Sequence, residues 1–179
     1  KTLKKEFPEC NVIAPTFEGN PIKYFQSVDI LIGNLEGETI IVGTSLGAFF
    51  GLCLSTLQDV KCFLINTSYF PELSLSEGIG KTHINHKTNE EFLLTQEFVD
   101  ELVTIRKDSG INKNDELLSN PNYYFSFKDE IINHSHLISR LDRIDRTEND
   151  LELHVKFEDQ DHRFENIDSV VEDIKDYLK

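Results

Sequence analysis

The apolar positions of the chain fall into two alternating patterns. Short continuous runs rich in β-branched and aromatic residues occur at 39–42, 62–65 and 123–127. Runs of this length that are apolar on both faces are typical of buried parallel strands. Other segments, such as 167–178, repeat apolar residues every three or four positions with charged residues between them, which predicts amphipathic helices. The alternation predicts an α/β fold with a doubly wound, mostly parallel sheet.

The same patterns predict how the first part of the chain is organised. The apolar segment 11–15 indicates a short buried strand. Asn20 suits the N-cap and Pro21 the first position of a helix that continues to Ile32. The further predicted elements are, in chain order, the end of a helix at 1–7, a helix at 46–57, a strand at 61–65, a helix at 90–106, a strand at 123–127, a helix at 130–141, a strand at 151–157 and a helix at 167–178.

One segment interrupts the regular alternation. Residues 66–121 are rich in Ser, Thr and Asn, contain Pro71 and two nearby glycines, and show a single helical stretch. We therefore expect residues 1–179 to form a single domain, with 66–121 as a cap-like insert that covers a site. In doubly wound sheets, ligands bind beyond the carboxyl ends of the strands.

Composition narrows the classes of partner and location. The formal net charge is -14, from 18 basic and 32 acidic residues, which opposes binding to nucleic acid. No apolar run approaches the roughly 20 residues that a membrane span needs. The three cysteines are odd in number and lie in or beside apolar stretches, which favours reduced, buried thiols over disulfides. Reduced thiols in turn favour a cytoplasmic location. The sequence leaves the oligomeric state open.

The segment 43–47 carries the clearest chemical signal. Its residues, Gly-Thr-Ser-Leu-Gly, match the pattern G-x-S-x-G, which places a nucleophilic serine on a sharp turn between a strand and a helix. By chance the bare pattern would occur in about one sequence in twenty of this length. Here a predicted strand precedes it and a predicted helix follows it, so we interpret Ser45 as a nucleophile. The alternative is that Gly43 and Gly47 form a tight turn and Ser45 only caps the helix.

A nucleophilic serine needs a general base, and six histidines are available. His162 lies in a polar loop between the last predicted strand and the last helix, where the base of a hydrolase with the order Ser, acid, His is expected. The alternative for His162 is a solvated loop residue. His83 and His86 are three residues apart without a nearby cysteine and are more typical of surface residues than of a zinc site. We predict no metal and no cofactor.

The acid that orients this base should follow the strand before the last strand–helix repeat. Asp129 directly follows the aromatic run 123–127 and Lys128. Glu130 is the alternative acid, but it lies one step into the predicted helix and could instead interact with the helix dipole. We favour Asp129.

These residues resemble those of the small YqiA-type esterases, an α/β-hydrolase family. The resemblance extends over nearly the whole chain and is carried by 41–49 around Ser45, by 128–131 around Asp129 and by 161–164 around His162. It implies Ser45 as nucleophile, Asp129 as acid and His162 as base, with the Leu46 N–H as an oxyanion donor. The family also has a first strand that ends in a His-Gly loop, which donates a second N–H to the oxyanion. Nothing in this sequence matches that strand, so we expect it to be missing from the chain.

The leading hypothesis is a serine hydrolase that cleaves a small-molecule carboxylic ester or thioester through an acyl-enzyme. The other hypothesis is a non-catalytic binding or scaffold protein that keeps the hydrolase fold. It is motivated by the unmatched oxyanion loop and by Lys128, which stands where the family usually has glycine. Apolar residues in the insert either line an acyl pocket above Ser45 or pack the cap onto the core. They are Tyr69, Phe70, Phe92, Leu93 and Leu94.

Overall fold

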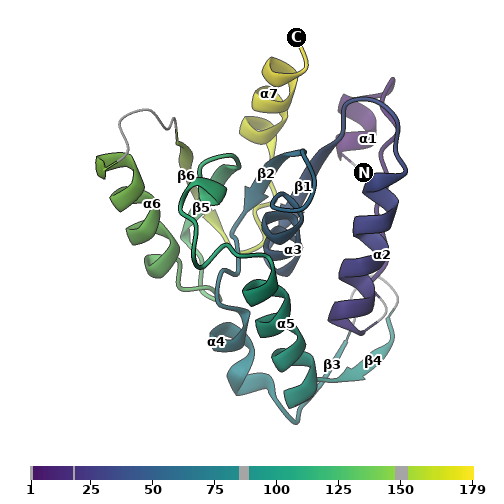
Figure 1. Ribbon diagram of the computed structural model, residues 1–179, viewed down its shortest axis with the longest axis vertical. Helices are drawn as coiled ribbons and strands as arrows, with labels where there is room; N and C mark the ends of the chain where they lie inside the picture. Colours follow the sequence, from purple (N-terminus) through teal and green to yellow (C-terminus); the bar gives the residue numbers. More distant parts are fainter. Residues whose placement is uncertain (1, 18, 85–88, 148–152) are drawn as a thin grey trace.

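In the part of the chain that the structure describes, four parallel strands form the central sheet (Figure 1). The computed structural model describes residues 2–17, 19–84, 89–147 and 153–179. The strands are β1 (Ile40–Thr44), β2 (Lys61–Ile65), β5 (Asn122–Lys128) and β6 (His154–Asp161), in the order β1-β2-β5-β6. Each pairs with its neighbour in parallel register. The prediction of an α/β fold with a parallel sheet is therefore confirmed.

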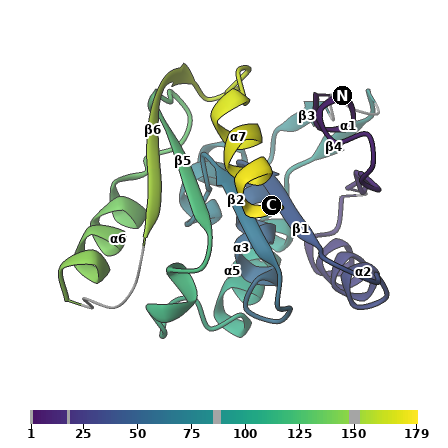
Figure 2. The same ribbon diagram turned by 90° about the horizontal axis from the view of Figure 1, so that it is seen from above.

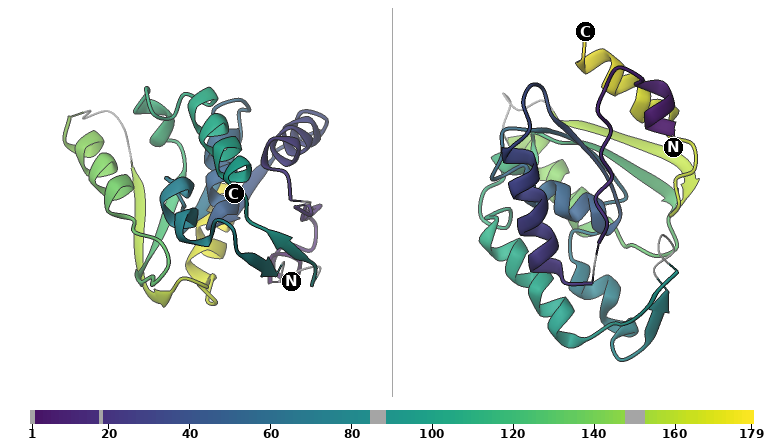
Figure 3. Two further views of the ribbon diagram at one scale, coloured as in Figure 1. Left: turned by 90° about the horizontal axis from the view of Figure 1, so that it is seen from below. Right: turned by 90° about the vertical axis from the view of Figure 1, so that its right-hand side faces the viewer.

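Helices cover both faces of this sheet. The helices in the described part of the chain are α1 (Thr2–Glu6), α2 (Pro21–Gly33), α3 (Leu46–Leu54), α4 (Pro71–Leu75), α5 (Gln96–Asp108), α6 (Ser135–Thr147) and α7 (Asp168–Tyr177), with short 3-10 turns η1 (Ser76–Gly78) and η2 (Glu116–Leu118). One face packs against α2, α3, α5 and α6. The other face packs against α7, with α1 beside it, and Figures 2 and 3 show α7 and α1 together on that side.

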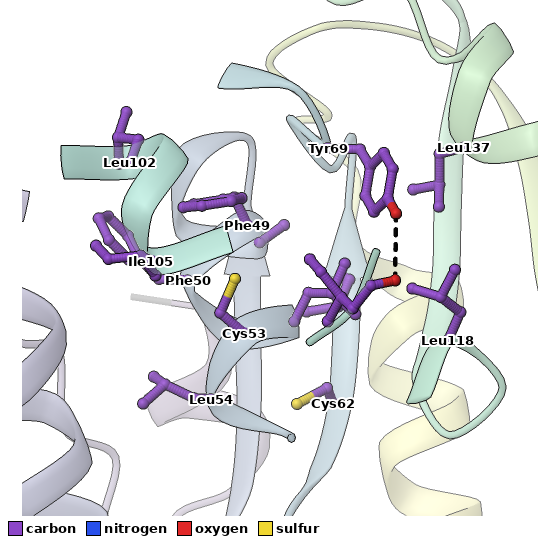
Figure 4. Packing of buried hydrophobic residues seen from close by; sticks show 14 of the residues in the cluster. Phe49, Phe50, Cys53, Leu54, Cys62, Tyr69, Leu102, Ile105, Leu118 and Leu137 are labelled. Atoms are coloured by element: carbon purple, nitrogen blue, oxygen red, sulfur yellow. Dashed lines mark hydrogen bonds between the residues drawn. The ribbon is translucent and has the colours of Figure 1, made fainter. Parts of the chain in front are cut away.

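The larger core is built around α3. Figure 4 shows Phe49, Phe50 and Cys53 of α3 near Leu102 and Ile105 of α5, and all five are at most 4% exposed. Helix α3 is apolar along almost its whole length because it lies between the sheet and α5. The packing therefore fixes the position of its N-terminus, where Ser45 stands.

The cysteines follow their prediction only in part. Cys53 and Cys62 are fully buried, and burial raises the pKa of each thiol to about 12. Both thiols are therefore protonated and unreactive at neutral pH. Cys10, by contrast, is exposed, because the segment around it does not enter the core.

The predicted strand at 11–15 is wrong. These residues have no regular structure, and Ile13 is 43% exposed. A buried parallel strand needs a hydrogen-bonded neighbour on the sheet, and within the described residues β1 pairs only with β2. An apolar run by itself does not supply that neighbour.

Helix boundaries in the second half also differ from the prediction. Glu91–Leu93 forms the strand β4, which pairs antiparallel with β3 (Thr82–Ile84), and α5 begins only after it. Helix α6 begins at Ser135 rather than at Glu130. The reason is that the Asp129 carboxylate accepts hydrogen bonds from two following backbone N–H groups, which holds the chain in a turn. No helix in the described ranges is long and apolar enough to cross a membrane.

Candidate active site

Four polar residues lie at one edge of the sheet because each directly follows a strand. Ser45 follows β1, Asn66 follows β2, Asp129 follows β5 and His162 follows β6. All four strands are parallel, so their carboxyl ends share this edge. This is where doubly wound folds place their ligand sites.

Ser45 stands on the sharp turn between β1 and α3. Its backbone has φ 55° and ψ -117°, a left-handed conformation that is uncommon for a non-glycine residue and is typical of strained functional turns. The Ser45 N–H donates to Ile65 O at 2.9 Å, and the Ser68 N–H donates to Ser45 O at 3.3 Å. Its side chain makes no capping hydrogen bond to α3. The alternative role of Ser45 as a simple helix cap is therefore not supported.

The two glycines of the motif have different roles. A Cβ added at Gly43 would lie 2.6 Å from Gly47 O and 2.7 Å from Ala48 Cα, so only glycine fits there. A Cβ added at Gly47 would meet no atom within 4 Å. A side chain is therefore sterically excluded at Gly43 but not at Gly47, because Gly47 takes part in the close approach through its carbonyl oxygen.

Asp129 and His162 are in direct contact. The His162 Nδ1 lies 3.0 Å from each carboxylate oxygen of Asp129. The Asp129 side chain is 2% exposed and that of His162 is 14% exposed. Because the carboxylate accepts a hydrogen bond from Nδ1, it favours the imidazole tautomer whose proton is on Nδ1. This tautomer leaves Nε2 free to accept a proton.

Several donors keep Asp129 ionised. Burial alone would raise its pKa, but hydrogen bonds from His162, from the backbone N–H groups of Ile132 and Ile131, and from His134 together hold the pKa below its usual range. The carboxylate is therefore negative at neutral pH, as a group that stabilises an imidazolium must be.

Glu130 has a different partner from Asp129. Its carboxylate accepts the backbone N–H of His162 at 3.2 Å, so it holds the loop rather than the imidazole. Two residues near His162 are also paired: Lys128 forms an exposed ion pair with Asp159 at 2.7 Å, and Gln160 exchanges two hydrogen bonds with the Asn166 backbone.

Asn66 and Ser126 connect the ends of three strands, β2, β5 and β6, and sequence reasoning missed both. The Asn66 Nδ2 donates to Ser126 Oγ at 2.8 Å and to His162 O at 3.1 Å, while its Oδ1 accepts the Ser126 N–H. Asn66 is fully buried and has φ 46°, a conformation that asparagine tolerates better than most residues. An asparagine directly after a predicted buried strand was the available signal.

Ser45 and His162 are less closely associated than His162 and Asp129. Within the described residues, no hydrogen bond joins the Ser45 side chain to His162. Catalytic hydrogen bonds often become short only in the complex with substrate. Leu46 is the first residue of α3, and the first N–H groups of a helix have no helical partner. Its N–H can therefore stabilise negative charge beside Ser45.

Two cavities lie near this edge of the sheet. The first, of about 290 Å³, borders the turn at Leu46 and Gly47. Its other lining residues are mostly apolar; they are Phe17, Tyr24, Phe50, Leu75, His83, Phe92, Leu94 and Phe98. The second, of about 230 Å³, lies between α4 and α6 and is lined in part by Thr67, Ser68 and His134.

The predicted cap residues divide between these cavities. Phe92 and Leu94 line the first, Tyr69 and Phe70 line the second, and Leu93 is 56% exposed and lines neither. The choice between an acyl pocket and simple packing thus applies to Phe92 and Leu94.

The prediction that His83 and His86 are surface residues is not met at His83. His83, on β3, is half-buried, and its Nε2 lies 3.3 Å from Gly78 O. Its side chain lines the first cavity. His86 lies outside the described residues. In the described ranges, no three His, Cys, Asp or Glu side chains gather closely enough to hold a metal ion.

Comparison with known families identifies the chain. The family model of UPF0227, described as an uncharacterised protein family, matches residues 1–179. The chain belongs to this family. The resemblance to YqiA-type proteins seen in the sequence is thereby confirmed. No curated protein sequence matches this UPF0227 chain.

Solved structures similar to this UPF0227 protein include lipolytic enzymes. A candidate lipase from Acinetobacter baumannii AYE is 14% identical with a TM-score of 0.51, over 93% of this chain and 70% of the other. A structure from work on LipS and LipT, two metagenome-derived lipolytic enzymes, is 11% identical with a TM-score of 0.55, over 89% and 73%. The glycosylation-associated Gap123 complex of Streptococcus agalactiae is 14% identical with a TM-score of 0.51, over 88% and 32%. At these identities the likeness shows the fold, an α/β fold with a mostly parallel central sheet and flanking helices.

Proposed function

We propose that the protein is a serine hydrolase that cleaves carboxylic esters or thioesters through an acyl-enzyme. Ser45 is the nucleophile, His162 the general base and Asp129 the acid that orients it. One observation carries the proposal. The hydrogen-bonded pair of Asp129 and His162 lies at the same sheet edge as Ser45, whose backbone is strained and whose side chain caps nothing.

The geometry supports a sequence of proton transfers. His162 donates its Nδ1 proton to Asp129 in a hydrogen bond, so its Nε2 accepts the Ser45 hydroxyl proton as Oγ attacks the acyl carbon. The Leu46 N–H, at the N-terminus of α3, stabilises the oxyanion. The imidazolium then returns the proton to the leaving oxygen or sulfur, and water releases the acid in a second round. The lipolytic activity named for two of the similar structures is consistent with this reaction.

The first cavity is the proposed site of the acyl group. It borders Leu46 and Gly47, next to the nucleophile, and aromatic and aliphatic side chains form most of its wall. An apolar pocket of this size favours an uncharged, hydrocarbon acyl chain. The strongly negative net charge of the protein adds a mild bias against anionic substrates.

Shortening Leu94 to alanine is expected to shift the acyl-length preference. Leu94 lines the first cavity and is 2% exposed, so the change enlarges the pocket. Longer acyl chains should gain in kcat/KM relative to shorter ones, because each methylene that fits is worth about 1–3 kcal/mol. The measurement is kcat/KM for a series of p-nitrophenyl esters of increasing length.

Leu93→Ala is the matched control for this series. Leu93 is the neighbouring leucine on β4, but it is 56% exposed and lines neither cavity. Its variant should keep the wild-type order of substrates. If Leu94→Ala lowers only the melting temperature and leaves that order unchanged, Leu94 packs the cap and does not contact the acyl chain.

The proposed function is tested most directly by covalent labelling. A fluorophosphonate probe reacts with an activated serine, and mass spectrometry of the digested protein should place the adduct on Ser45. Phenylmethyl or p-nitrophenyl esters should then be hydrolysed by unlabelled protein only. A folded protein that shows neither adduct nor turnover would instead support the non-catalytic scaffold.

A further inference from the structure

A second histidine binds the Asp129 carboxylate. The His134 Nε2 lies 2.7 Å from Asp129 Oδ2, while His162 Nδ1 lies 3.0 Å from both oxygens. The backbone N–H groups of Ile131 and Ile132 each donate to Oδ1 at 2.9 Å. Without His134, Oδ2 would therefore share only the His162 donor, whereas Oδ1 would keep both backbone donors.

His134 is held in place by its surroundings. Its side chain is 7% exposed, and its ring lies 5.0 Å from that of Phe125 on β5. Within the described chain its Nδ1 is buried without a hydrogen-bond partner. Protonation of Nδ1 would bury a second N–H with no acceptor, which is unfavourable.

This environment selects one form of His134. Burial lowers its pKa, and the opposing effect of the Asp129 carboxylate does not reverse that shift. At neutral pH the ring is therefore uncharged, with its proton on Nε2 and donated to Asp129. The contact is a hydrogen bond from a neutral donor rather than an ion pair.

We propose that His134 is a positioning residue for the reaction: its Nε2–H fixes Asp129 Oδ2, so that both carboxylate oxygens face His162 Nδ1. This inference rests on the proposed function of Ser45, Asp129 and His162. A carboxylate held at only one oxygen can rotate about its terminal bond, and His162 would then lose the orientation that Asp129 imposes. Precise support of this kind is what catalytic side chains require.

The sequence gives a weak signal for this role. His134 follows Asp129 by five residues, and the sequence pattern places it inside a helix that began at Glu130. In the structure α6 begins at Ser135, and the turn that starts at Asp129 brings His134 back to the carboxylate.

Proton NMR tests the positioning role without any substrate. Imidazole N–H protons that donate to a carboxylate resonate far downfield, so the wild-type protein should show two such signals, from His162 and His134. His134→Gln places an amide donor near the position of Nε2 and should keep the His162 signal sharp. His134→Leu offers no donor, so the His162 signal should move and broaden through faster exchange with water. Identical His162 signals in both variants would overturn the proposal.

Kinetics on the same variants provide the second arm. In His134→Leu, kcat for ester cleavage should fall about tenfold or more with KM little changed, because misplaced catalytic groups lose transition-state stabilisation. His134→Gln should recover most of that loss. His136→Leu is the control and should keep the wild-type kcat, because His136 is exposed and its ring contacts Phe70, with no bond to Asp129 among the described residues. Equal losses of kcat in the Gln and Leu variants, matched by equal drops in melting temperature, would show a structural role and overturn the proposal.

The two arms separate this inference from the proposed function. If the wild-type protein hydrolyses no ester, the proposed function fails, yet the NMR comparison still decides whether His134 orders the pair of Asp129 and His162. If esters are hydrolysed and His134→Leu keeps the wild-type kcat, the proposed function stands and the positioning role is excluded.

Discussion

Replacing Ser45 with alanine is expected to lower kcat for ester cleavage by roughly 10⁴-fold or more, since the covalent step then has no nucleophile. The fold should be unaffected. The Ser45 side chain makes no capping hydrogen bond, and the turn is held by backbone bonds to Ile65 and Ser68. The measurement is hydrolysis of a short p-nitrophenyl ester by wild-type and variant protein, with circular dichroism to verify folding.

A second serine variant makes this comparison specific. Ser27 lies on the exposed side of α2, remote in sequence from the strand ends, and its hydroxyl donates to the Tyr24 carbonyl in its own helix. Ser27→Ala should retain wild-type kcat and the fluorophosphonate adduct. Undiminished cleavage by Ser45→Ala would rule out the assigned nucleophile, and activity lost in both variants would indicate damage unrelated to the site.

The strand ends explain why much of the candidate site could be predicted from sequence. The β-branched and aromatic runs mark β2 and most of β5 because these strands are buried on both faces, and they mark β1, which is mostly half-buried. Ser45 and Asp129 directly follow two of these strands, so parallel pairing alone predicts one shared edge for them. His162 was expected in a loop, and β6 in fact continues to Asp161, directly before it.

Contacts between segments far apart in the chain could not be predicted from the sequence. Asn66 bonds to Ser126 and to the His162 backbone, across 60 and 96 residues, and no local pattern encodes such a pairing. The structure of the segment 11–15 could not be predicted for the same reason. Its apolar residues satisfy the pattern of a buried strand, but a strand forms only where a neighbour can pair with its backbone.

Local competition explains the remaining errors. The segment 130–134 shares the helical periodicity of α6, yet the Asp129 side chain binds the N–H groups of Ile131 and Ile132 and delays the start of the helix. Side chains of this type commonly compete with helical hydrogen bonds in this way. The β3–β4 hairpin was missed because each strand has only three residues, too few for alternation to be recognised.

Gly43→Ala is expected to cause a large loss of stability, whereas Gly47→Ala is not. At Gly43 the added methyl carbon would lie 2.6–2.8 Å from Gly47 O and from Ala48 Cα and N. These are backbone atoms that no side-chain rotation can move, so β1 and α3 must separate. Forced overpacking of this kind costs about 1–3 kcal/mol and sometimes more, a large share of the roughly 5–15 kcal/mol that stabilises a typical domain.

Gly47 offers the matched comparison for this prediction. It belongs to the same motif, but its added Cβ meets nothing within 4 Å, and it lies within α3. Alanine in a helix is more favourable than glycine by about 0.5–1 kcal/mol, so Gly47→Ala should unfold at an equal or higher urea concentration. Urea unfolding, monitored by circular dichroism, measures the free energy of unfolding of each variant. Equal stability of the two variants would mean that the turn before Ser45 adapts to a side chain, and that the close approach of β1 to α3 does not set the position of the nucleophile.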